Sequence, residues 1–586
     1  MIGVVPALNA CEGDRKGGFT FVGAKGPGED LFVSFHDLRL WAQRRAAHYA
    51  KAGLRRGDRV ALVIPEGEHF VPAFLGALWG GLIPVPLYPP LSMGKLDAFM
   101  DSLVSILNVA KPRVLVTTDR VAKVLWSAVG RIPSIEKVIA AEELTADPGA
   151  PLPDAAEVRD DDVAFLQFTS GSTALPKGVM VTHGSLAANC KAIIRDGLRG
   201  GPEDKAVSWL PLYHDMGLIG FVLSPLCFRI STAFIPTLSF IKNATLWMET
   251  LHRHRGTMTF APNFAYALVN KRARPEQIAR WDLSCVRVFG CGAEPINAGT
   301  LRAFTAAMAP AGLKPTALLP CYGMAEATLA MSFIGLDEPL RTDRIDAERY
   351  HKEAKATPIS NGASFLEVVN CGRAFPGHEL SVQDEKGRLL PERHVGELCF
   401  RGPSVTAGYW ENPEATRAAF RDGWLHTGDL GYMADGEVYV SGRIKDILIV
   451  NGRNYCPQTI EWLVDEIPGV RRGSAVVFTR PGAASEEIIV AAESRTATPD
   501  ALKAQIVARV SEELQLAVSD VALVEPGSLP KTSSGKLQRR KTRDQYLNGT
   551  IGRGGRSANG RLAMARHLAM SFMGRARHEV RKLFGG

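Results

Sequence analysis

The chain has 586 residues and a mass of 63.4 kDa, which at roughly 100–200 residues per domain predicts several folded units. Apolar residues make up 46% and charged residues 22%, which excludes a disordered or fibrous chain. None of the nine cysteines forms a Cys-x-x-Cys pair, so a zinc ribbon is excluded and a reducing compartment is favoured. Of the net charge of +8, residues 526–586 carry +12 and the preceding residues −4. Non-specific nucleic-acid binding would therefore have to reside in this basic end, and we expect no nucleic-acid partner.

Targeting signals are absent from the sequence. The N-terminus has no basic segment before an apolar one, so it does not resemble a signal peptide. The most apolar stretches, such as Gly217–Pro225, are far shorter than a membrane-spanning helix. A soluble, cytoplasmic protein is the expectation.

Apolar runs alternate with helical patterns through the first four hundred residues. Strands are predicted at Val60–Pro65, Val114–Thr117, Val163–Phe168 and Val286–Phe289, and helices at Glu68–Trp79, Ser185–Asp196 and from about Ala298. This alternation predicts α/β layers with buried, mostly parallel sheets.

The pattern changes after about Gly442. Short strands are predicted at Ile447–Val450, Ala475–Phe478, Ile488–Ala491 and Val521–Glu525, and helices at Pro457–Glu466 and Ala501–Leu514. We therefore predict a large unit over residues 1–443 and a small α+β unit over 444–550, with their junction near Arg443–Asp446.

Residues 551–586 form a tail that begins with a stretch rich in glycine and arginine. Residues 560–584 are predicted to be a basic amphipathic helix, because apolar residues recur there at spacings of three and four. The simplest interpretation is a tail that packs on its own body or stays loose. Contact with a membrane surface or an acidic protein is the alternative.

The strongest motif is Phe168-Thr-Ser-Gly-Ser-Thr-Ala-Leu-Pro-Lys-Gly178, in which a strand runs into a loop of small hydroxyl residues. Such a loop offers backbone N–H groups and hydroxyls to an anion, with Lys177 as a positive charge nearby. It does not match the Walker pattern, and no Gly-x-Gly-x-x-Gly occurs, which argues against a dinucleotide fold.

Two further small-residue blocks, Gly290-Cys-Gly-Ala-Glu-Pro295 and Cys321-Tyr-Gly-Met-Ala-Glu326, follow predicted strands. Ligands in open α/β sheets bind at the carboxyl ends of strands, so the three loops suggest one shared crevice. Tyr322 can stack on a flat base and Glu326 can hold a hard cation. Either residue alone would more often serve packing or solvation.

Charged residues near the predicted junction are further candidates for the site. Asp429 can accept hydrogen bonds from two ribose hydroxyls, Arg443 can pair with a phosphate, and Lys445 falls at a plausible hinge. Lys536 follows a small run, Thr532-Ser-Ser-Gly535, and can bring a positive charge into a site on the other unit. Each of these alone is equally consistent with a surface charge on a turn.

Together these blocks resemble the adenylate-forming superfamily, over roughly residues 30–545. The resemblance implies a large N-terminal adenylate-forming domain, a small mobile C-terminal domain, and ATP and Mg²⁺ as cofactors. It also implies acyl-adenylate formation followed by transfer to a thiol. By matching position, the resemblance assigns the phosphate loop to Thr169, Ser170, Gly171, Ser172, Thr173 and Lys177. It assigns the rest of the nucleotide site to Gly292, Ala293, Glu294, Pro295, Tyr322, Gly323, Met324, Asp429 and Arg443. Glu326 would hold magnesium, Lys536 would be the adenylation lysine and Lys445 the hinge.

A narrower resemblance is to the fatty acyl-AMP ligases. It is carried by Ser208-Trp-Leu-Pro-Leu-Tyr-His-Asp-Met-Gly-Leu218, which would place His214 beside the substrate, and by the sequence from Gly442 to Pro457. The long stretch between Ala327 and Cys371 resembles that subgroup's insertion, at about residues 335–368. The resemblance implies a medium- or long-chain fatty acid as substrate and the phosphopantetheine thiol of an acyl carrier protein as acceptor.

Other functions remain open from the sequence. A long-chain acyl-CoA ligase would share every adenylation residue and differ only in its acceptor. A catalytically idle scaffold would retain the fold without the chemistry. Trp209, Phe264 and Tyr266 can line an acyl pocket or simply pack in the core.

Overall fold

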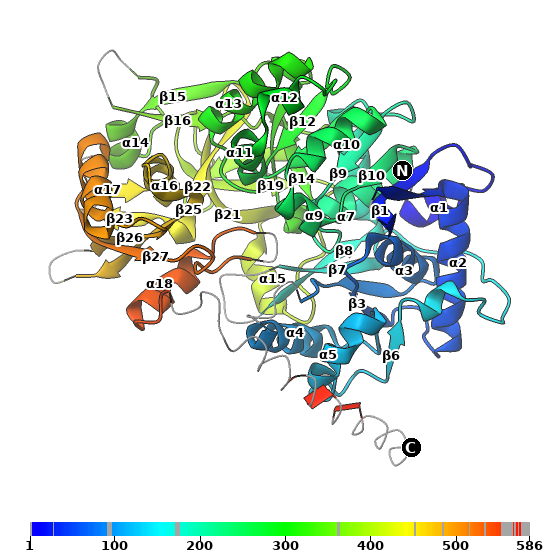
Figure 1. Ribbon diagram of the computed structural model, residues 1–586. Coiled ribbons are helices and arrows are strands. Elements are labelled where there is room, and N and C mark those ends of the chain that lie inside the picture. Colours follow the sequence, from blue (N-terminus) through cyan, green and yellow to red (C-terminus); the bar gives the residue numbers. More distant parts are fainter. Residues whose placement is uncertain are drawn as a thin grey trace.

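The computed structural model describes residues 3–26, 28–90, 96–169, 176–359, 364–450, 453–482, 486–514, 516–532 and 535–552, together with 567, 570–571 and 574–575 of the tail. A large body of helices and sheets carries a smaller unit at one side (Figure 1). The predicted fold class is confirmed, because layered sheets and helices form a large N-terminal unit and a smaller α+β unit follows it. Within the part that the structure describes, no helix is long and apolar enough to cross a membrane.

A nine-stranded sheet forms the centre of the large unit. Its order is β17 (Arg373–Ala374), β14 (Ala330–Phe333), β13 (Leu318–Gly323), β12 (Val288–Cys291), β11 (Met258–Ala261), β9 (Lys205–Ser208), β10 (Ser231–Phe234), β1 (Gly18–Gly26) and β2 (Glu29–Ser34). The six inner strands, β13 to β1, are parallel and the edges are antiparallel. The short inner strands β11 and β12 are buried along their whole length, as expected for strands covered on both faces.

A second, all-parallel sheet follows the alternation predicted from the sequence. Its order is β4 (Ile83–Pro86), β3 (Arg59–Val63), β5 (Val114–Thr117) and β6 (Lys137–Ala140), with α3 (Gly67–Trp79), α4 (Leu96–Ala110) and α5 (Asp119–Val129) between its strands in the chain. The predicted strand at Val114–Thr117 is reproduced without a shift. The predicted helix at Glu68–Trp79 begins one residue earlier.

The strand before the hydroxyl-rich loop is antiparallel, contrary to the mostly parallel pairing predicted for this half of the chain. β7 (Val163–Thr169) pairs with β8 (Lys177–Thr182), and Thr169 lies opposite Lys177. The physical reason is the short connection, because only a hairpin can join two paired strands over seven residues. Ser170, Gly171, Ser172 and Thr173, which were predicted to bind phosphate, lie outside the described residues.

An antiparallel sheet precedes the small unit. It comprises β18 (Glu379–Gln383), β19 (Gly396–Arg401), β20 (Phe420–Arg421), β21 (Trp424–Ala434) and β22 (Glu437–Arg443). The single-turn helix η8 (Ile444–Asp446) follows β22 directly, where the sequence predicted the junction. The predicted limits at 443 and 550 remain predictions.

The small unit has its own buried core. Strands β25 (Val470–Pro481), β26 (Glu486–Ser494) and β27 (Val518–Val524) form its sheet, and the hairpin of β23 (Leu448–Val450) and β24 (Arg453–Tyr455) lies beside it. Helices α16 (Pro457–Asp465) and α17 (Pro499–Leu514) contribute Ile460, Val464, Ile506 and Val510 to the core. Helix α18 (Arg539–Leu547) ends the unit.

The tail contacts the large unit. His567 lies between α4 and α5: its Nε2 is 2.6 Å from Asp97 Oδ1, and its Nδ1 is 3.0 Å from Ser127 Oγ. Ser571 donates its hydroxyl to Val124 O at 2.7 Å and accepts a hydrogen bond from Ser127 N. The described tail residues are helical, and His567, Ser571 and Gly574, which are buried, are spaced by four, three and seven positions, so they share one face. The apolar stripe predicted for this helix lies outside the described residues.

Candidate active site

One cavity of about 2730 Å³ lies between the large and small units. Its lining includes fourteen residues predicted from the sequence, from both units: Thr169, Lys177, His214, Ala293, Glu294, Pro295, Tyr322, Gly323, Met324, Glu326, Asp429, Arg443, Lys445 and Lys536. Gly292 does not line it. That glycine packs against Cys321, and a side chain there would collide with the Cys321 sulfur. The expected convergence of three strand-end loops on one crevice is therefore observed for the described residues.

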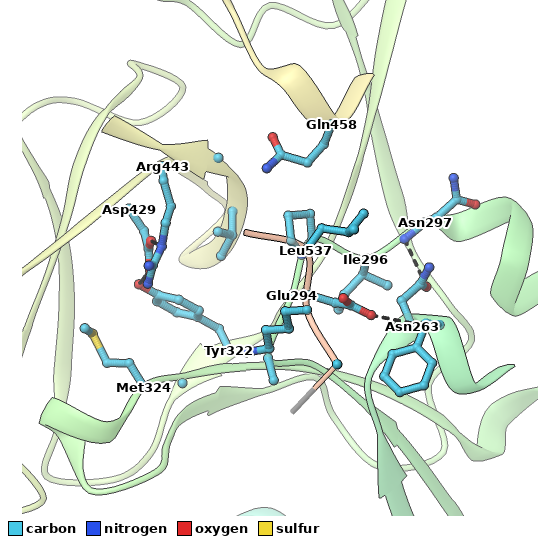
Figure 2. Close-up of a pocket in the computed structure, with 18 of the residues that line it drawn as sticks. Asn263, Glu294, Ile296, Asn297, Tyr322, Met324, Asp429, Arg443, Gln458 and Leu537 are labelled. Atoms are coloured by element: carbon cyan, nitrogen blue, oxygen red, sulfur yellow. Dashed lines mark hydrogen bonds and ion pairs between the residues drawn. The ribbon is translucent and has the colours of Figure 1, made fainter. Parts of the chain in front are cut away.

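Asp429 is buried on β21, and both of its carboxylate oxygens have partners (Figure 2). The Tyr322 hydroxyl donates to Oδ2 at 2.8 Å, and Arg443 Nε donates to Oδ1 at 2.8 Å. The neighbouring Asp429 charge and hydrogen bond outweigh burial and raise the pKa of Arg443, so that guanidinium stays protonated. This corner thus holds a fixed acceptor with a cation beside it, which suits the diol and phosphate of a nucleotide.

Glu294 turns its carboxylate toward the start of helix α11 (Asn263–Arg272). Its Oε1 accepts the Phe264 N–H at 3.0 Å, so it satisfies one of the free amides at that helix end. Burial raises the pKa of Glu294, although this hydrogen bond and Lys536 act in the opposite direction. In this structure the side chain therefore orders the loop that was predicted to contact adenine.

His214, Asp215 and Lys536 meet at the centre of the cavity. His214 Nδ1 is 2.5 Å from Asp215 Oδ1, and Lys536 is close enough to influence the charge of Asp215. Burial lowers the pKa of Lys536, while Asp215 and Glu294 raise it. The small unit thus delivers an ammonium group to a site on the large unit, as predicted for Lys536. The sequence analysis missed Asp215, although it follows His214 directly in the quoted motif.

Glu326 lies close to the strand pair that flanks the phosphate loop. Tyr409 donates its hydroxyl to Glu326 Oε1 at 2.7 Å, and Lys177 Nζ lies 4.7 Å from the centre of the Tyr409 ring. Burial raises the pKa of Glu326, and the nearby Asp215 charge adds to this, although Tyr409 and Arg443 lower it. Among the described residues no ion pair neutralises Glu326. A carboxylate with one oxygen unshared, beside a second carboxylate, fits a hard divalent cation such as Mg²⁺.

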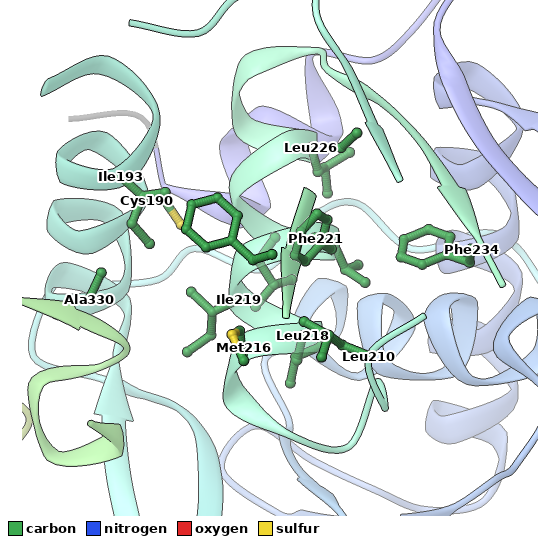
Figure 3. Packing of buried hydrophobic residues seen from close by; sticks show 14 of the residues in the cluster. Cys190, Ile193, Leu210, Met216, Leu218, Ile219, Phe221, Leu226, Phe234 and Ala330 are labelled. Atoms are coloured by element: carbon green, nitrogen blue, oxygen red, sulfur yellow. The ribbon is translucent and has the colours of Figure 1, made fainter. Parts of the chain in front are cut away.

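An apolar branch of the cavity extends into the large unit. It passes two π-helical segments, Ala192–Gly197 and Ile219–Leu223, which contribute Ile193, Ile194 and Phe221 to its wall. Figure 3 shows Ile193 and Phe221 among the packed side chains of this region. Segments of π-helix are frequent at functional sites because they displace side chains from the regular helical pattern. This branch can accommodate an apolar chain.

The aromatic residues proposed for the acyl pocket divide into two groups. Trp209 and Phe264 line the cavity. Tyr266 does not; it is fully buried and donates its hydroxyl to Gly290 O at 2.6 Å. Its role is therefore core packing, which was the alternative left open by the sequence.

Comparison with known proteins identifies two matching families. Residues 14–410 match the AMP-binding enzyme family, and residues 445–553 match the AMP domain of the Disco-interacting protein 2-like family. A "Putative acyl-CoA synthetase" of Caulobacter vibrioides is 40% identical, over 89% of this chain and 91% of the relative. "Long-chain-fatty-acid--AMP ligase FadD26" of Mycobacterium bovis is 35% identical, over 87% of this chain and 92% of the relative.

Solved structures are similar over both units. A structure from a study of fatty acyl-adenylate ligases of E. coli and L. pneumophila has a TM-score of 0.88 at 34% identity, covering 94% of this chain and 98% of the other. An L. pneumophila fatty acyl-adenylate ligase in complex with acyl adenylate and pyrophosphate has a TM-score of 0.71 at 29% identity, covering 94% and 96%.

Proposed function

Because the chain belongs to the AMP-binding enzyme family and is an adenylate-forming ligase, we propose that it is a fatty acyl-AMP ligase that serves a carrier protein. In this proposal a medium- or long-chain fatty acid reacts with ATP to give acyl-adenylate and pyrophosphate. The acyl group then passes to the phosphopantetheine thiol of an acyl carrier protein.

The observation that carries the proposal is a single cavity with three chemically distinct parts. Asp429 and Arg443 form a nucleotide corner, Lys536 lies beside Asp215, and an apolar branch extends between the π-helical segments. A carboxylate at the mouth of that branch would lie between a nucleotide and an ammonium group. The names of the mycobacterial relative and of the L. pneumophila complex support the same substrate class.

In the first step a carboxylate oxygen of the fatty acid attacks the α-phosphorus of ATP. The bond to the bridging oxygen breaks, and its electron pair leaves with pyrophosphate. Lys536 offsets the charge that develops on the phosphoryl oxygens, and Lys177 lies near the departing phosphates. Glu326 would hold Mg²⁺, which when bound supplies charge neutralisation for the triphosphate.

In the second step the thiol sulfur of the acceptor attacks the acyl carbon. The carbon–oxygen bond to AMP breaks, AMP leaves with the electron pair, and the thiol proton is released to solvent. His214 lies beside Asp215 at the position where the two reactants would meet. Its role would be to orient the acyl-adenylate.

The choice of a carrier protein as acceptor is supported by the segment at about residues 335–368, which resembles the insertion of the fatty acyl-AMP ligases. Its helix α14 (Ala347–Glu353) packs on β24 of the small unit, and Figure 1 shows α14 beside that unit. His351 contacts the backbone oxygen of Asn454, and the Tyr350 hydroxyl, which donates to Ser441 Oγ within the large unit, lies 3.9 Å from Cys456 Sγ of the small unit. These contacts would restrain the small unit in the present arrangement and so disfavour free CoA.

The second candidate function is a long-chain acyl-CoA ligase. It is favoured by the name of the Caulobacter relative, which is 40% identical. It requires the same adenylation residues and differs in the acceptor alone.

A mass-spectrometric competition separates the two candidates. The purified protein, ATP, Mg²⁺ and a mixture of fatty acids are offered CoA and a phosphopantetheinylated carrier protein together. We expect acyl-carrier product with little acyl-CoA, and abundant acyl-CoA would favour the second candidate.

The Lys536→Ala variant tests the catalytic assignment. We expect a loss of about 10²–10³ in fatty-acid-dependent ATP–pyrophosphate exchange, the scale observed when one electrostatic donor is removed. Lys386→Ala, on an exposed turn away from the cavity, is the matched control. Exchange at the wild-type rate in Lys536→Ala would refute the assignment.

A further inference from the structure

A second branch of the cavity reaches the surface between two helices of the large unit. They are α9 (Thr237–Lys242) and α11, and their side chains Leu238, Ile241 and Leu268 line the branch. On its inner side the branch passes Trp209 and Phe264, which themselves line the cavity near His214. The same cavity therefore touches both this pair of surface helices and the candidate site.

The outer end of this branch is apolar and positively charged. Leu238 is 50% exposed and Ile241 43% exposed, one helical turn apart on α9. Lys242 and Lys271 beside them are exposed and have no ion-pair partner among the described residues. Exposed apolar side chains framed by unpaired cations are typical of a surface that binds an anionic partner.

The two helices are fixed relative to each other. Arg272 donates from Nη1 to the backbone oxygens of Ile241 and Lys242, both at 2.9 Å, and so joins the end of α11 to the end of α9. The mouth of the branch is thus preformed, which lowers the entropic cost of binding.

The inner wall carries an unsatisfied donor. The Trp209 ring is stacked on Phe240 with centroids 3.8 Å apart and meets Phe264 edge to face at 5.9 Å. Its indole Nε1 is buried and has no hydrogen-bond partner among the described residues. Because that N–H is closed off even to water, a ligand in the cavity would contact the rings of Trp209 and Phe264 and not this donor.

We propose that the branch between α9 and α11 admits the phosphopantetheine arm of the carrier protein, and that Leu238, Ile241, Lys242 and Lys271 form the docking surface for that protein. This proposal rests on the proposed function. The arm fits the chemistry in order from the outside inward. Its phosphodiester is anionic at the basic mouth, its chain passes the rings of Trp209 and Phe264, and its thiol ends near His214.

The small unit lies at the inner end of this branch. Gly535, which precedes Lys536, lies close to the Phe264 ring. The loop that delivers the adenylation lysine thus rests on the wall that the arm must pass. Adenylation and arrival of the thiol would therefore exclude each other, and the order of the two steps follows.

The test measures acyl transfer with a phosphopantetheinylated carrier protein and, separately, with free pantetheine. We compare the double variant Lys242→Glu/Lys271→Glu and the variant Leu238→Asp with the wild type. We expect the KM for the carrier protein to rise about tenfold or more, because charge reversal at an interface weakens encounter and binding. ATP–pyrophosphate exchange and transfer to free pantetheine should stay unchanged. Lys314→Glu, an exposed cation away from the cavity, is the control.

The outcomes separate this inference from the proposed function. Wild-type protein that acylates neither acceptor would refute the proposed function itself. Wild-type carrier acylation, with an unchanged KM in the charge and Leu238 variants, would overturn the docking surface alone. A wild-type dimer that Leu238→Asp converts to monomer would assign the patch to a second copy of the chain and also overturn it.

Discussion

Lys536 illustrates how one residue can make the whole reaction depend on pH. Burial lowers its pKa, and Asp215 and Glu294 compensate only in part. The proposed role needs the protonated ammonium. The rate of adenylation should therefore fall as pH rises, and this fall should begin at a pH below the ordinary pKa of lysine. In Lys536→Arg this alkaline decline should move to higher pH, since arginine stays protonated. A pH profile of ATP–pyrophosphate exchange checks this, and an identical decline in both proteins would contradict it.

Asp465 provides a residue-scale prediction about stability. Burial raises its pKa to about 7, its Oδ2 accepts the Gly473 N–H at 2.9 Å, and its Oδ1 has no hydrogen-bond partner among the described residues. The Asp465 carboxyl group therefore binds its proton more tightly in the folded protein than in the unfolded chain. Its contribution to the free energy of unfolding is complete below the pKa that Asp465 has in the unfolded chain, and it is lost as pH rises toward 7.

The variant Asp465→Asn lacks this dependence. We expect its free energy of unfolding to equal that of the wild type near pH 4 and to exceed it by roughly 1–3 kcal/mol at pH 8. Urea unfolding followed by the fluorescence of Trp462, on the same helix, would measure the difference. A constant difference across pH would show that the charge of Asp465 is not its cause.

At the scale of elements, α14 connects the insertion-like segment to the small unit. His351→Ala removes the contact with Asn454, and Tyr350→Phe removes the hydroxyl that contacts Cys456 Sγ of the small unit. Weaker restraint should raise acyl-CoA formation severalfold, because each lost hydrogen bond costs about 1 kcal/mol. His394→Ala is the control, since the hydrogen bond of its ring among the described residues is to the nearby backbone oxygen of Glu392. Unchanged CoA turnover in the double variant would remove the structural argument for a carrier-protein acceptor.

The elements also show what can be predicted from the sequence. Strands such as β5 and β12 are continuous apolar runs, because they are covered on both faces, and they were found within two residues. The sheet of β18 to β22 was missed, since its strands mix exposed and buried positions and only long-range pairing fixes them. The helix predicted at Ser185–Asp196 was found, but its change to π-geometry at Ala192 has no local signal.

The candidate site was predictable where a motif places a residue at the end of a strand. Tyr322, near the end of β13, belongs to this class, whereas Asp429 within β21 and Lys536 in the loop before α18 were indicated by their motifs alone. Tyr409 was not predictable, because its bond to Glu326 joins residues 83 positions apart. The opening of the cavity between α9 and α11 was not predictable either, because it exists only after the two helices pack.

For the molecule as a whole, almost all of the tail lies beyond the residues that match the two family models. His567→Ala combined with Ser571→Ala should loosen the tail from α5. Amide hydrogen exchange of residues 124–129 should then accelerate, by roughly 5- to 30-fold if about 1–2 kcal/mol of protection is lost. Ser494→Ala, whose hydroxyl bonds inside the small unit, is the control. Unchanged exchange would show that the tail contributes no protection there.

The tail contact has a geometric consequence. The small unit is joined to the large one at η8, and after Gly552 the chain reaches the large unit again at His567, so the two units and their connections form a closed loop. The fifteen peptide steps between Gly552 and His567 span at most about 50 Å. That length sets an upper limit on how far the end of the small unit can travel while the tail stays bound. Progressive shortening of residues 553–566 should therefore leave acyl-adenylate formation intact and stop thioester formation below a threshold length.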